Sequence, residues 1–281
     1  MKNIFSLFII LIIFNACTQE GTISIDTESA VVEAYLFAGQ PVDSVNITQS
    51  FSYARENSDL ITLENLSVEI SNGTEFFPLF HSSEGIYQNM EFIPQSGQSY
   101  TLSFTHNGET ISSETFVPEK KEVAISQSSI ELEKIEGGGF PGGGGGGGGF
   151  GGGGIDEAIE ITWDNAEGDF YYVVVENIEE NPEFVNDRQA QFQANGQARR
   201  FFNITEPEIS NFHALNTRRD LVQFGTYQII IFRVNPEYAA LYESSGNSSV
   251  TISQPPNNIE NGLGIFTGIS SDTVFLEVIK L

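Results

Sequence analysis

The stretch YTLSFTHNGETISSETFV, residues 100–117, carries a clear strand–turn–strand pattern. Tyr100, Leu102 and Phe104 alternate with polar residues, which is the period of a half-buried strand. The pair Asn107-Gly108 favours the type I′ turn of a tight hairpin, after which residues 111–117 return antiparallel. The stretch therefore predicts a β-hairpin with one apolar face.

Other short strands surround this hairpin. Alternating patterns occupy residues 31–36, 45–51 and 66–70. A second Asn-Gly pair, Asn72-Gly73, again favours a type I′ turn, and a further strand starts at Gly85. Short strands separated by turn signals at this spacing predict a β-sandwich over residues 30–118.

The second half also shows strands. Ile159, Ile161 and Trp163 alternate, and residues 224–234 form the most apolar strand of the chain. Trp163 followed by 170–175 resembles the B–C hairpin of fibronectin type III-like sandwiches, in which a Trp packs over a Tyr/Val-rich strand. We expect a mostly β protein with two immunoglobulin- or fibronectin-III-like β-sandwich domains in tandem, at residues 30–118 and 122–281.

Two short helices and a last hairpin are expected in the second domain. Thr205 and Glu208 fit a capping box, which predicts a helix from there to about Leu215. Pro236 follows the apolar strand and starts a second helix to about residue 245, ended by a glycine. Residues 265–270 and 273–279 are predicted to close as a final hairpin.

A glycine-rich tract interrupts the second domain at residues 137–154. Only Phe140, Pro141 and Phe150 break the glycines, and no Lys or Ser/Thr ends the tract as a phosphate-binding loop requires. Because strand residues resume at once, we interpret the tract as a loop insertion between two strands. A second interpretation is that Phe140 and Phe150 are aromatic side chains that contact a partner.

The N-terminus indicates export and lipid attachment. Lys2 and a short apolar run precede Ala16 and Cys17, the only cysteine. A charged start, an apolar core and a small residue before the cut are typical of a secretory signal. The cysteine after the cut resembles a bacterial lipobox. We predict a signal peptide at residues 1–16, lipidation of Cys17, a polar tether at 17–29 and attachment to a membrane through the lipid.

Composition limits the partners. The chain has 38 acidic and 12 basic residues, a formal net charge of −26. Such a charge repels nucleic-acid phosphate, so nucleic-acid binding is set aside. With one cysteine no intrachain disulfide can form. Aromatic residues make up 12% of the chain, which suits β-sheet cores or aromatic contact surfaces.

No catalytic pattern stands out. His81, His106 and His213 lie far apart, and none has a His or Cys at metal-ligand spacing. No serine-nucleophile elbow is present. We expect no cofactor, no metal and no enzymatic activity. The pairs Arg199-Arg200 and Arg218-Arg219 either form salt bridges with the acidic surface or make a basic patch for an anionic ligand.

The block NNIENGLGIF, residues 257–266, admits two interpretations. Its asparagines cap turns and its glycines permit close backbone approach, so it is either a structural corner or a surface that contacts a partner. The candidate contact residues are Asn258, Asn261, Leu263 and Phe266. Two Asp-Ser/Thr-apolar triplets resemble Bacteroidota O-glycosylation sites, at Ser44 and Thr273; the alternative is that both are ordinary strand residues.

Several segments together resemble one family. They are residues 32–36, 85–87, 97–102, 238–242 and 258–266. The chain resembles cell-surface lipoproteins of Bacteroidota, a domain-of-unknown-function family whose genes often accompany TonB-dependent receptors. The resemblance implies a location and a kind of partner and no mechanism. The glycine-rich tract departs from the family pattern.

We therefore expect a surface-exposed outer-membrane lipoprotein that is a non-enzymatic accessory subunit of an outer-membrane β-barrel, with a TonB-dependent receptor in nutrient uptake as the leading candidate. One alternative is a structural subunit of outer-membrane protein assembly or surface lipoprotein export machinery. Another is direct binding of a glycan or peptide.

Overall fold

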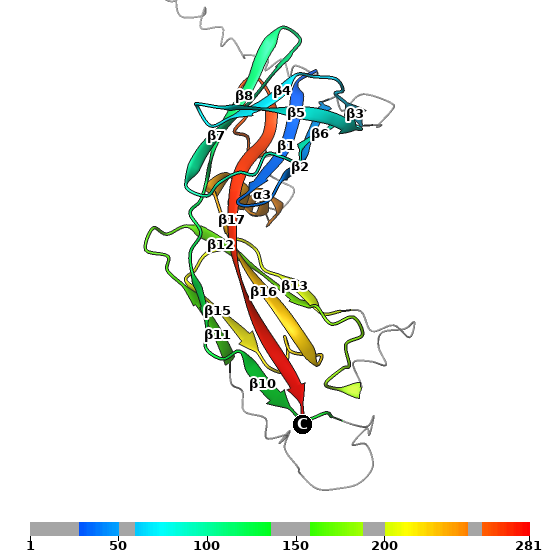
Figure 1. Cartoon of the computed structure of the whole chain (residues 1–281), viewed down its shortest axis with the longest axis vertical. Helices are drawn as coiled ribbons and strands as arrows, with labels where there is room; N and C mark the ends of the chain where they lie inside the picture. Colours follow the sequence, from blue (N-terminus) through cyan, green and yellow to red (C-terminus); the bar gives the residue numbers. More distant parts are fainter. Residues whose placement is uncertain (1–27, 51–59, 136–157, 188–199, 247–254) are drawn as a thin grey trace, which may run out of the picture.

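The computed structural model describes residues 28–50, 60–135, 158–187, 200–246 and 255–281 (Figure 1). The predicted signal peptide, Cys17, most of the tether, the glycine-rich tract, Phe140 and Phe150 lie outside these ranges. Within them the chain is built almost entirely of β-strands, with one helix, α3 (Pro236–Gly246). The expectation of a mostly β fold is confirmed.

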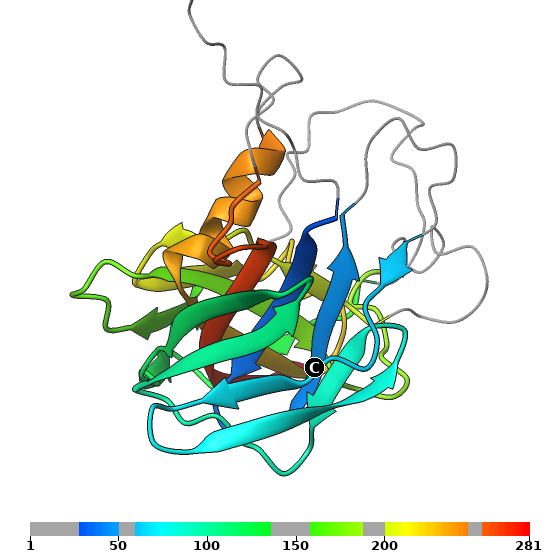
Figure 2. The same cartoon turned by 90° about the horizontal axis from the view of Figure 1, so that it is seen from above.

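Eight strands form the first sandwich. They are β1 (Ala30–Phe37), β2 (Val42–Gln49), β3 (Ile61–Thr62), β4 (Val68–Ser71), β5 (Phe76–Ser83), β6 (Ile86–Asn89), β7 (Gln98–His106) and β8 (Glu109–Val117). In strand order, β1-β2-β6-β5 continues through β4-β7-β8. The first half of β5 pairs with β4 and the second half with β6, so β5 turns the corner between the two layers. Figure 2 shows these strands from above.

The two Asn-Gly turns have different outcomes. The hairpin β7–β8 pairs from Gln98↔Val117 to His106↔Glu109, and Asn107 and Gly108 have φ values of 52° and 83°, as a type I′ turn requires. At the other pair β4 and β5 close on Ser71↔Phe76, so residues 72–75 form a four-residue loop. There the Asn72 side chain accepts hydrogen bonds from the backbone NH groups of residues 74 and 75. The prediction of a type I′ turn at Asn72 is therefore wrong.

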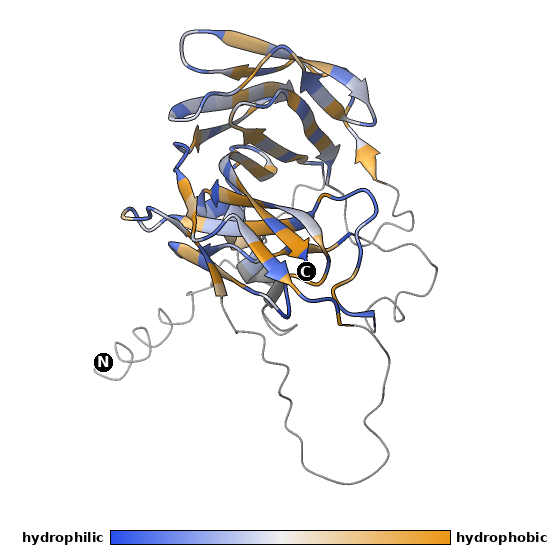
Figure 3. Ribbon diagram, turned by 60° about the horizontal axis from the view of Figure 1, so that its bottom comes forward, coloured by the Kyte–Doolittle hydropathy of each residue, from blue (hydrophilic) through white to orange (hydrophobic). Residues whose placement is uncertain are grey.

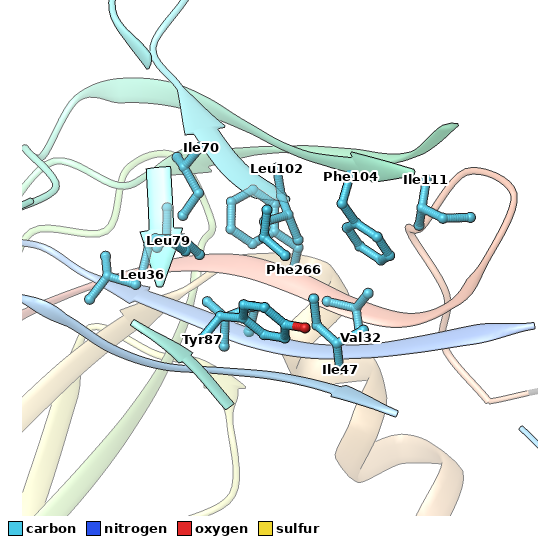
Figure 4. Packing of buried hydrophobic residues seen from close by; sticks show 14 of the residues in the cluster. Val32, Leu36, Ile47, Ile70, Leu79, Tyr87, Leu102, Phe104, Ile111 and Phe266 are labelled. Atoms are coloured by element: carbon cyan, nitrogen blue, oxygen red, sulfur yellow. The ribbon is translucent and has the colours of Figure 1, made fainter. Parts of the chain in front are cut away.

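The first core lies between these layers (Figure 4). Val32 and Ile47 face Leu102 across the sandwich, and the ring of Phe266 completes the core although it comes from the far end of the chain. Tyr87 is fully buried, and its hydroxyl donates to the carbonyl of Leu63 at 2.7 Å. A buried phenol needs such a partner.

The remaining strands form the second sandwich. They are β9 (Val123–Ile125), β10 (Ser129–Leu132), β11 (Ala158–Trp163), β12 (Phe170–Asn177), β13 (Phe202–Ile204), β14 (Glu208–Ile209), β15 (Phe212–Asn216), β16 (Gly225–Val234) and β17 (Leu263–Lys280). The three-stranded sheet β15-β11-β9 covers the core side of β12, β16 and β17. Trp163 packs on Tyr171 with ring centroids 5.2 Å apart, as the sequence predicts, but their strands belong to facing sheets and do not form a hairpin.

The last strand differs most from expectation. The predicted final hairpin is wrong, because residues 263–280 form one continuous strand, β17. Its first half pairs parallel with β1, from Val31↔Leu263 to Phe37↔Ile269. Its second half pairs antiparallel with β16 and parallel with β10. At about 3.3 Å per residue β17 is about 60 Å long, and it runs through both sandwiches (Figure 1).

One of the two expected helices is absent. The segment after Thr205 forms β14 and β15, because the Thr205 hydroxyl accepts a hydrogen bond from the backbone NH of Val173 at 2.9 Å and so joins the neighbouring strand. The second helix is confirmed as α3. In its first turn, the backbone NH groups of residues 238 and 239 donate to the carbonyl of Asn235.

The C-terminal segment crosses between the sandwiches. Ile259 and Phe266 pack in the first core, whereas Leu276 and Val278 pack in the second. Residues 257–269 therefore belong structurally with the first sandwich, although the expected domain at 122–281 places them with the second. The chain passes from the first core to the second near residue 118, returns to the first between Ile231 and Ile259, and passes to the second again along β17.

Two phenylalanines of β17 give a matched test. Phe266 is 0% exposed and Phe275 is 50% exposed. Phe266→Ala is expected to lower the free energy of unfolding by about 3–5 kcal/mol through the cavity it leaves. Phe275→Ala is expected to change it by less than about 1 kcal/mol. Urea unfolding followed by tryptophan and tyrosine fluorescence measures both variants, and equal losses would contradict the placement of Phe266.

Candidate functional site: the junction and the flanking sheet

The end of β8 lies directly on β17 at Gly268. A Cβ atom at this position would lie 2.5 Å from the carbonyl oxygen of Phe116 and 2.6 Å from the Cα of Val117. The backbone NH of Gly268 donates to the hydroxyl of Thr115 at 2.9 Å. Only glycine allows this approach, so the two segments are fixed against each other by backbone contact.

Asn235 connects three segments at the same place. Its side-chain amide donates to the carbonyl of Phe116 at 2.8 Å and lies 3.3 Å from the carbonyl of Gly268. Its own carbonyl starts α3. One half-buried side-chain amide thus joins β8 and β17 at the start of the helix, and it explains why an asparagine follows β16.

Arg233 holds the connection between the sandwiches. Its side chain is 13% exposed, and Nη1 donates to the carbonyl of Glu119 at 3.0 Å. Nη2 forms an ion pair with Asp169 and lies 4.0 Å from Glu167. Removing either carboxylate partner would leave a largely buried charge unpaired, which is costly, so this guanidinium keeps the connection in place on the second sandwich.

Asp272 holds two further residues of the connection, Lys120 and Val123. Lys120 Nζ lies 2.8 Å from Asp272 Oδ1, and the backbone NH of Val123 donates to Oδ2 at 3.1 Å. Burial opposes ionisation of the carboxyl, but the hydrogen bonds from Lys120 and from the backbone NH groups of Thr273 and Val123 outweigh it and lower its pKa. The polar residues at the middle of β17 therefore serve as contacts for the connection.

A small pocket lies beside this cluster, lined among others by Tyr171, Arg233, Ser270 and Asp272. Within the part of the chain that the structure describes, the Tyr171 hydroxyl and Arg233 Nε have no hydrogen-bond partner. Burial raises the pKa of Tyr171 to about 12, so the phenol stays neutral at physiological pH. The cations around the pocket are paired with carboxylates, so it does not attract an anion.

Aromatic rings gather on the opposite face of the sheet. Tyr172 stacks on Phe232 with centroids 4.6 Å apart and on Tyr238 of α3 at 5.6 Å. Tyr238 also meets Tyr35 of β1 edge-on at 5.9 Å. Burial raises the pKa of Tyr172 to about 12. The helix is thus fixed over the junction by aromatic contacts from both sandwiches.

The candidate contact residues of 257–266 are mostly engaged within the chain. Asn258 exchanges two hydrogen bonds with the backbone of Phe266, at 2.7 and 2.9 Å. Phe266 is fully buried, so the prediction that it contacts a partner is wrong. Asn261 is exposed with φ 56°, and its amide donates to the carbonyl of Thr110 at 3.0 Å; Leu263 is half-buried. The block is a structural corner that docks on β8.

The two candidate glycosylation residues lie in different surroundings. Ser44 is exposed on β2 beside a register shift between Val42 and Val45. Thr273 is half-buried in the middle of β17, opposite Ile230. Only Ser44 therefore offers an accessible hydroxyl at a strand irregularity.

The remaining candidate polar residues stay apart. In the described ranges no group of three or more His, Cys, Asp and Glu side chains is arranged to hold a metal ion. Arg200 lies 3.9 Å from Glu176, and Arg219 lies 2.9 Å from Asp220, which favours the salt-bridge interpretation of these arginines over a basic patch. No described helix is both long and apolar enough to span a bilayer.

The fold and the junction together define a mostly β protein with sandwich-like sheets joined along one strand. The chain matches, over residues 20–274, the family described as Domain of unknown function (DUF4249), and it belongs to that family. A search of curated proteins found no match.

One solved structure with a partial match is the crystal structure of domains A168–A170 from titin. It has 9% sequence identity and a TM-score of 0.20, and the match covers 74% of this chain and 61% of the titin chain. The match thus spans less than two thirds of that structure.

The junction contacts predict a pH-dependent effect of Asp272→Asn, a change that keeps the side-chain shape and removes its charge. The pKa of Asp272 is lowered on folding, so its contribution to stability is present above the unfolded pKa of about 3.9 and is lost as pH falls through the folded pKa.

Asp272→Asn is therefore expected to lower the urea midpoint at pH 7 and to differ little from wild type near pH 2.5. Asp43→Asn, at an exposed position of β2, is the matched control and should match wild type at both values. A loss for Asp272→Asn that persists unchanged at acidic pH would contradict the role of the charge.

Proposed function

We propose that the protein is a surface-exposed outer-membrane lipoprotein that acts as a non-enzymatic accessory subunit of an outer-membrane β-barrel, with a TonB-dependent receptor in nutrient uptake as the first candidate. The observation that carries the proposal is the combination of the lipobox-like cysteine at position 17 with a two-sandwich body fixed along one strand. The acidic, disulfide-free composition suits the same role.

The direction of the strands supports this arrangement. β1 starts at Ala30 and runs parallel to β17, whose end lies at the far tip of the second sandwich (Figure 1). The start of β1 therefore lies at the opposite end of the molecule. Twelve residues lie between Cys17 and Ala30 in the sequence, a span of at most about 45 Å. The first sandwich would then lie near the membrane, and the second would project away from it.

Such tethering favours a partner in the same membrane. Lipid attachment confines the protein to the surface, so a weak contact with a barrel becomes effectively intramolecular and is occupied at high local concentration. A rigid body is suited to this task, because no free energy is needed to order the two sandwiches on binding.

The aromatic cluster at the junction favours a second candidate function, the direct binding of a glycan or peptide. Tyr35 and Tyr238 are only partly buried, and aromatic rings of this kind form contact surfaces for such ligands. Titration calorimetry of the soluble body with candidate oligosaccharides and peptides distinguishes this function from an accessory role.

Cys17→Ala tests the proposal. In the native cell, wild type and the matched variant Thr18→Ala are expected to incorporate labelled palmitate, to fractionate with the outer membrane and to recover one barrel protein after detergent solubilisation and affinity purification. Cys17→Ala is expected to lose the label and at least tenfold of the recovered barrel.

Recovery of wild type without any barrel would contradict the accessory role. Recovery of the assembly machinery, with many outer-membrane proteins disturbed on depletion, would favour the scaffold alternative.

A further inference from the structure

The outward side of the large sheet in the second sandwich is unusually apolar. In the first sandwich the outward residues of β7 are Ser99, Thr101, Ser103 and Thr105, and antiparallel sheets commonly have such a polar solvent side. Figure 3 shows the hydropathy of the strands of both sandwiches. In β12 the residues Tyr171, Val173 and Val175 face the core, yet the alternating residues 170, 172 and 174 are apolar as well.

The register extends this apolar surface over four strands. Residues directly opposite each other on antiparallel strands share a face. Val174 lies opposite Ile204 on one side and Ile230 on the other, and Ile230 lies opposite Thr273. Two residues further along β12, Glu176 lies opposite Phe202 on one side and Gln228 on the other, and Gln228 lies opposite Phe275. We name this surface of β13, β12, β16 and β17 the outer face.

The outer face is exposed in the described structure. Helix α3 covers only the rows near Tyr172, where Tyr238 stacks. Beyond the helix, Phe202, Ile204 and Phe275 expose 60%, 46% and 50% of their surface. Large apolar side chains aligned on one side of a sheet mark an interaction surface more often than isolated exposed residues do.

Charge indicates which kind of partner covers the outer face. Glu176 lies within it and Glu277 lies at its distal end, opposite Thr226. Arg200, two residues before β13, is the nearest cation that the described residues place beside Glu176. Its Nη1 lies 3.9 Å from Glu176 Oε1. A second copy of the chain would bring the same two carboxylates and a net charge of −26 against this one, which opposes self-association.

We propose that the outer face is the docking surface for a different protein, whose contact region has an apolar centre flanked by Lys and Arg side chains. This inference rests on the proposed accessory role and identifies the part of the molecule that performs it. The apolar centre supplies the buried contact, and the carboxylates of Glu176 and Glu277 favour a basic partner over another copy.

The test uses a photo-crosslinking phenylalanine analogue in the full chain in native membranes. It is introduced at position 202 or 275 of the outer face, or at position 76 as the control. Phe76 is 67% exposed and lies on β5 of the first sandwich. We expect crosslinks from 202 and 275 to the same protein, in a segment with apolar residues next to Lys or Arg, and none to that protein from 76.

Two matched double variants measure the effect. Phe202→Ser with Phe275→Ser is expected to lower recovery of the crosslinked partner at least tenfold. Phe76→Ser with Phe80→Ser, at 67% and 63% exposure, is expected to leave it within twofold. Raising the salt concentration from 0.1 to 0.5 M is expected to lower recovery of the partner by the wild type about threefold. Glu176→Gln with Glu277→Gln is expected to reduce this loss.

The outcomes separate the two proposals. A barrel that is recovered equally by both phenylalanine variants, without crosslinks from 202 or 275, overturns the outer face and leaves the accessory role standing. A crosslinked non-barrel protein with a basic flank supports the outer face and overturns the barrel partner. Crosslinks to a second copy, to lipid alone, to a segment without basic residues, or to nothing overturn the inference.

Discussion

The pairing of β17 with both β1 and β16 is the constraint on which the rest of the structure depends. Ile269 is the register partner of Phe37 in the first sandwich and of Val234 in the second. Because backbone hydrogen bonds continue through this residue, the two sheets cannot rotate about it without breaking the ladders. Gly268, Asn235, Arg233 and Asp272 then fix the connection near residue 119 against the same strand.

Local features of the sequence predicted most of the local structure, apart from the turn type at Asn72-Gly73. The hairpin at 100–117 depends only on alternation and on Asn107-Gly108, and α3 depends on Pro236 after an apolar strand, so neighbouring residues suffice for both. Features decided by distant residues were missed. The polar residues Ser270–Asp272 suggested a turn, but their partners lie at 119, 120 and 123. Thr205 suggested a helix cap, but its hydroxyl bonds to Val173.

The candidate site shows the same division. The sequence indicated that residues 257–266 are special, and the structure shows why: Asn258 pairs with the backbone of Phe266 and so guides the chain into the first core. It left open whether Phe266 packs in the core or contacts a partner, because that core is built mostly by strands from the first half of the chain. The sequence does carry a signal for the outer face. The apolar runs at 170–175 and 229–232 do not alternate with polar residues, which indicates strands with apolar side chains on both sides.

These features suggest how the parts of the molecule work together. The outward residues of β7 in the first sandwich are polar, whereas the large sheet of the second carries apolar side chains on both sides, and β17 holds the two sandwiches in one orientation. In the proposed function a lipid at the N-terminus and a contact surface on the second sandwich require such a fixed body between them.

Hydrogen–deuterium exchange along β17 tests the continuity of this strand most directly. Amides that belong to one cooperative unit exchange only through its opening. If β17 joins the sandwiches rigidly, the amides of residues 267–273 will be protected as strongly as those of residues 229–233 in β16. Rapid exchange confined to 267–273, with slow exchange on either side, would show a hinge and contradict the role assigned to β17.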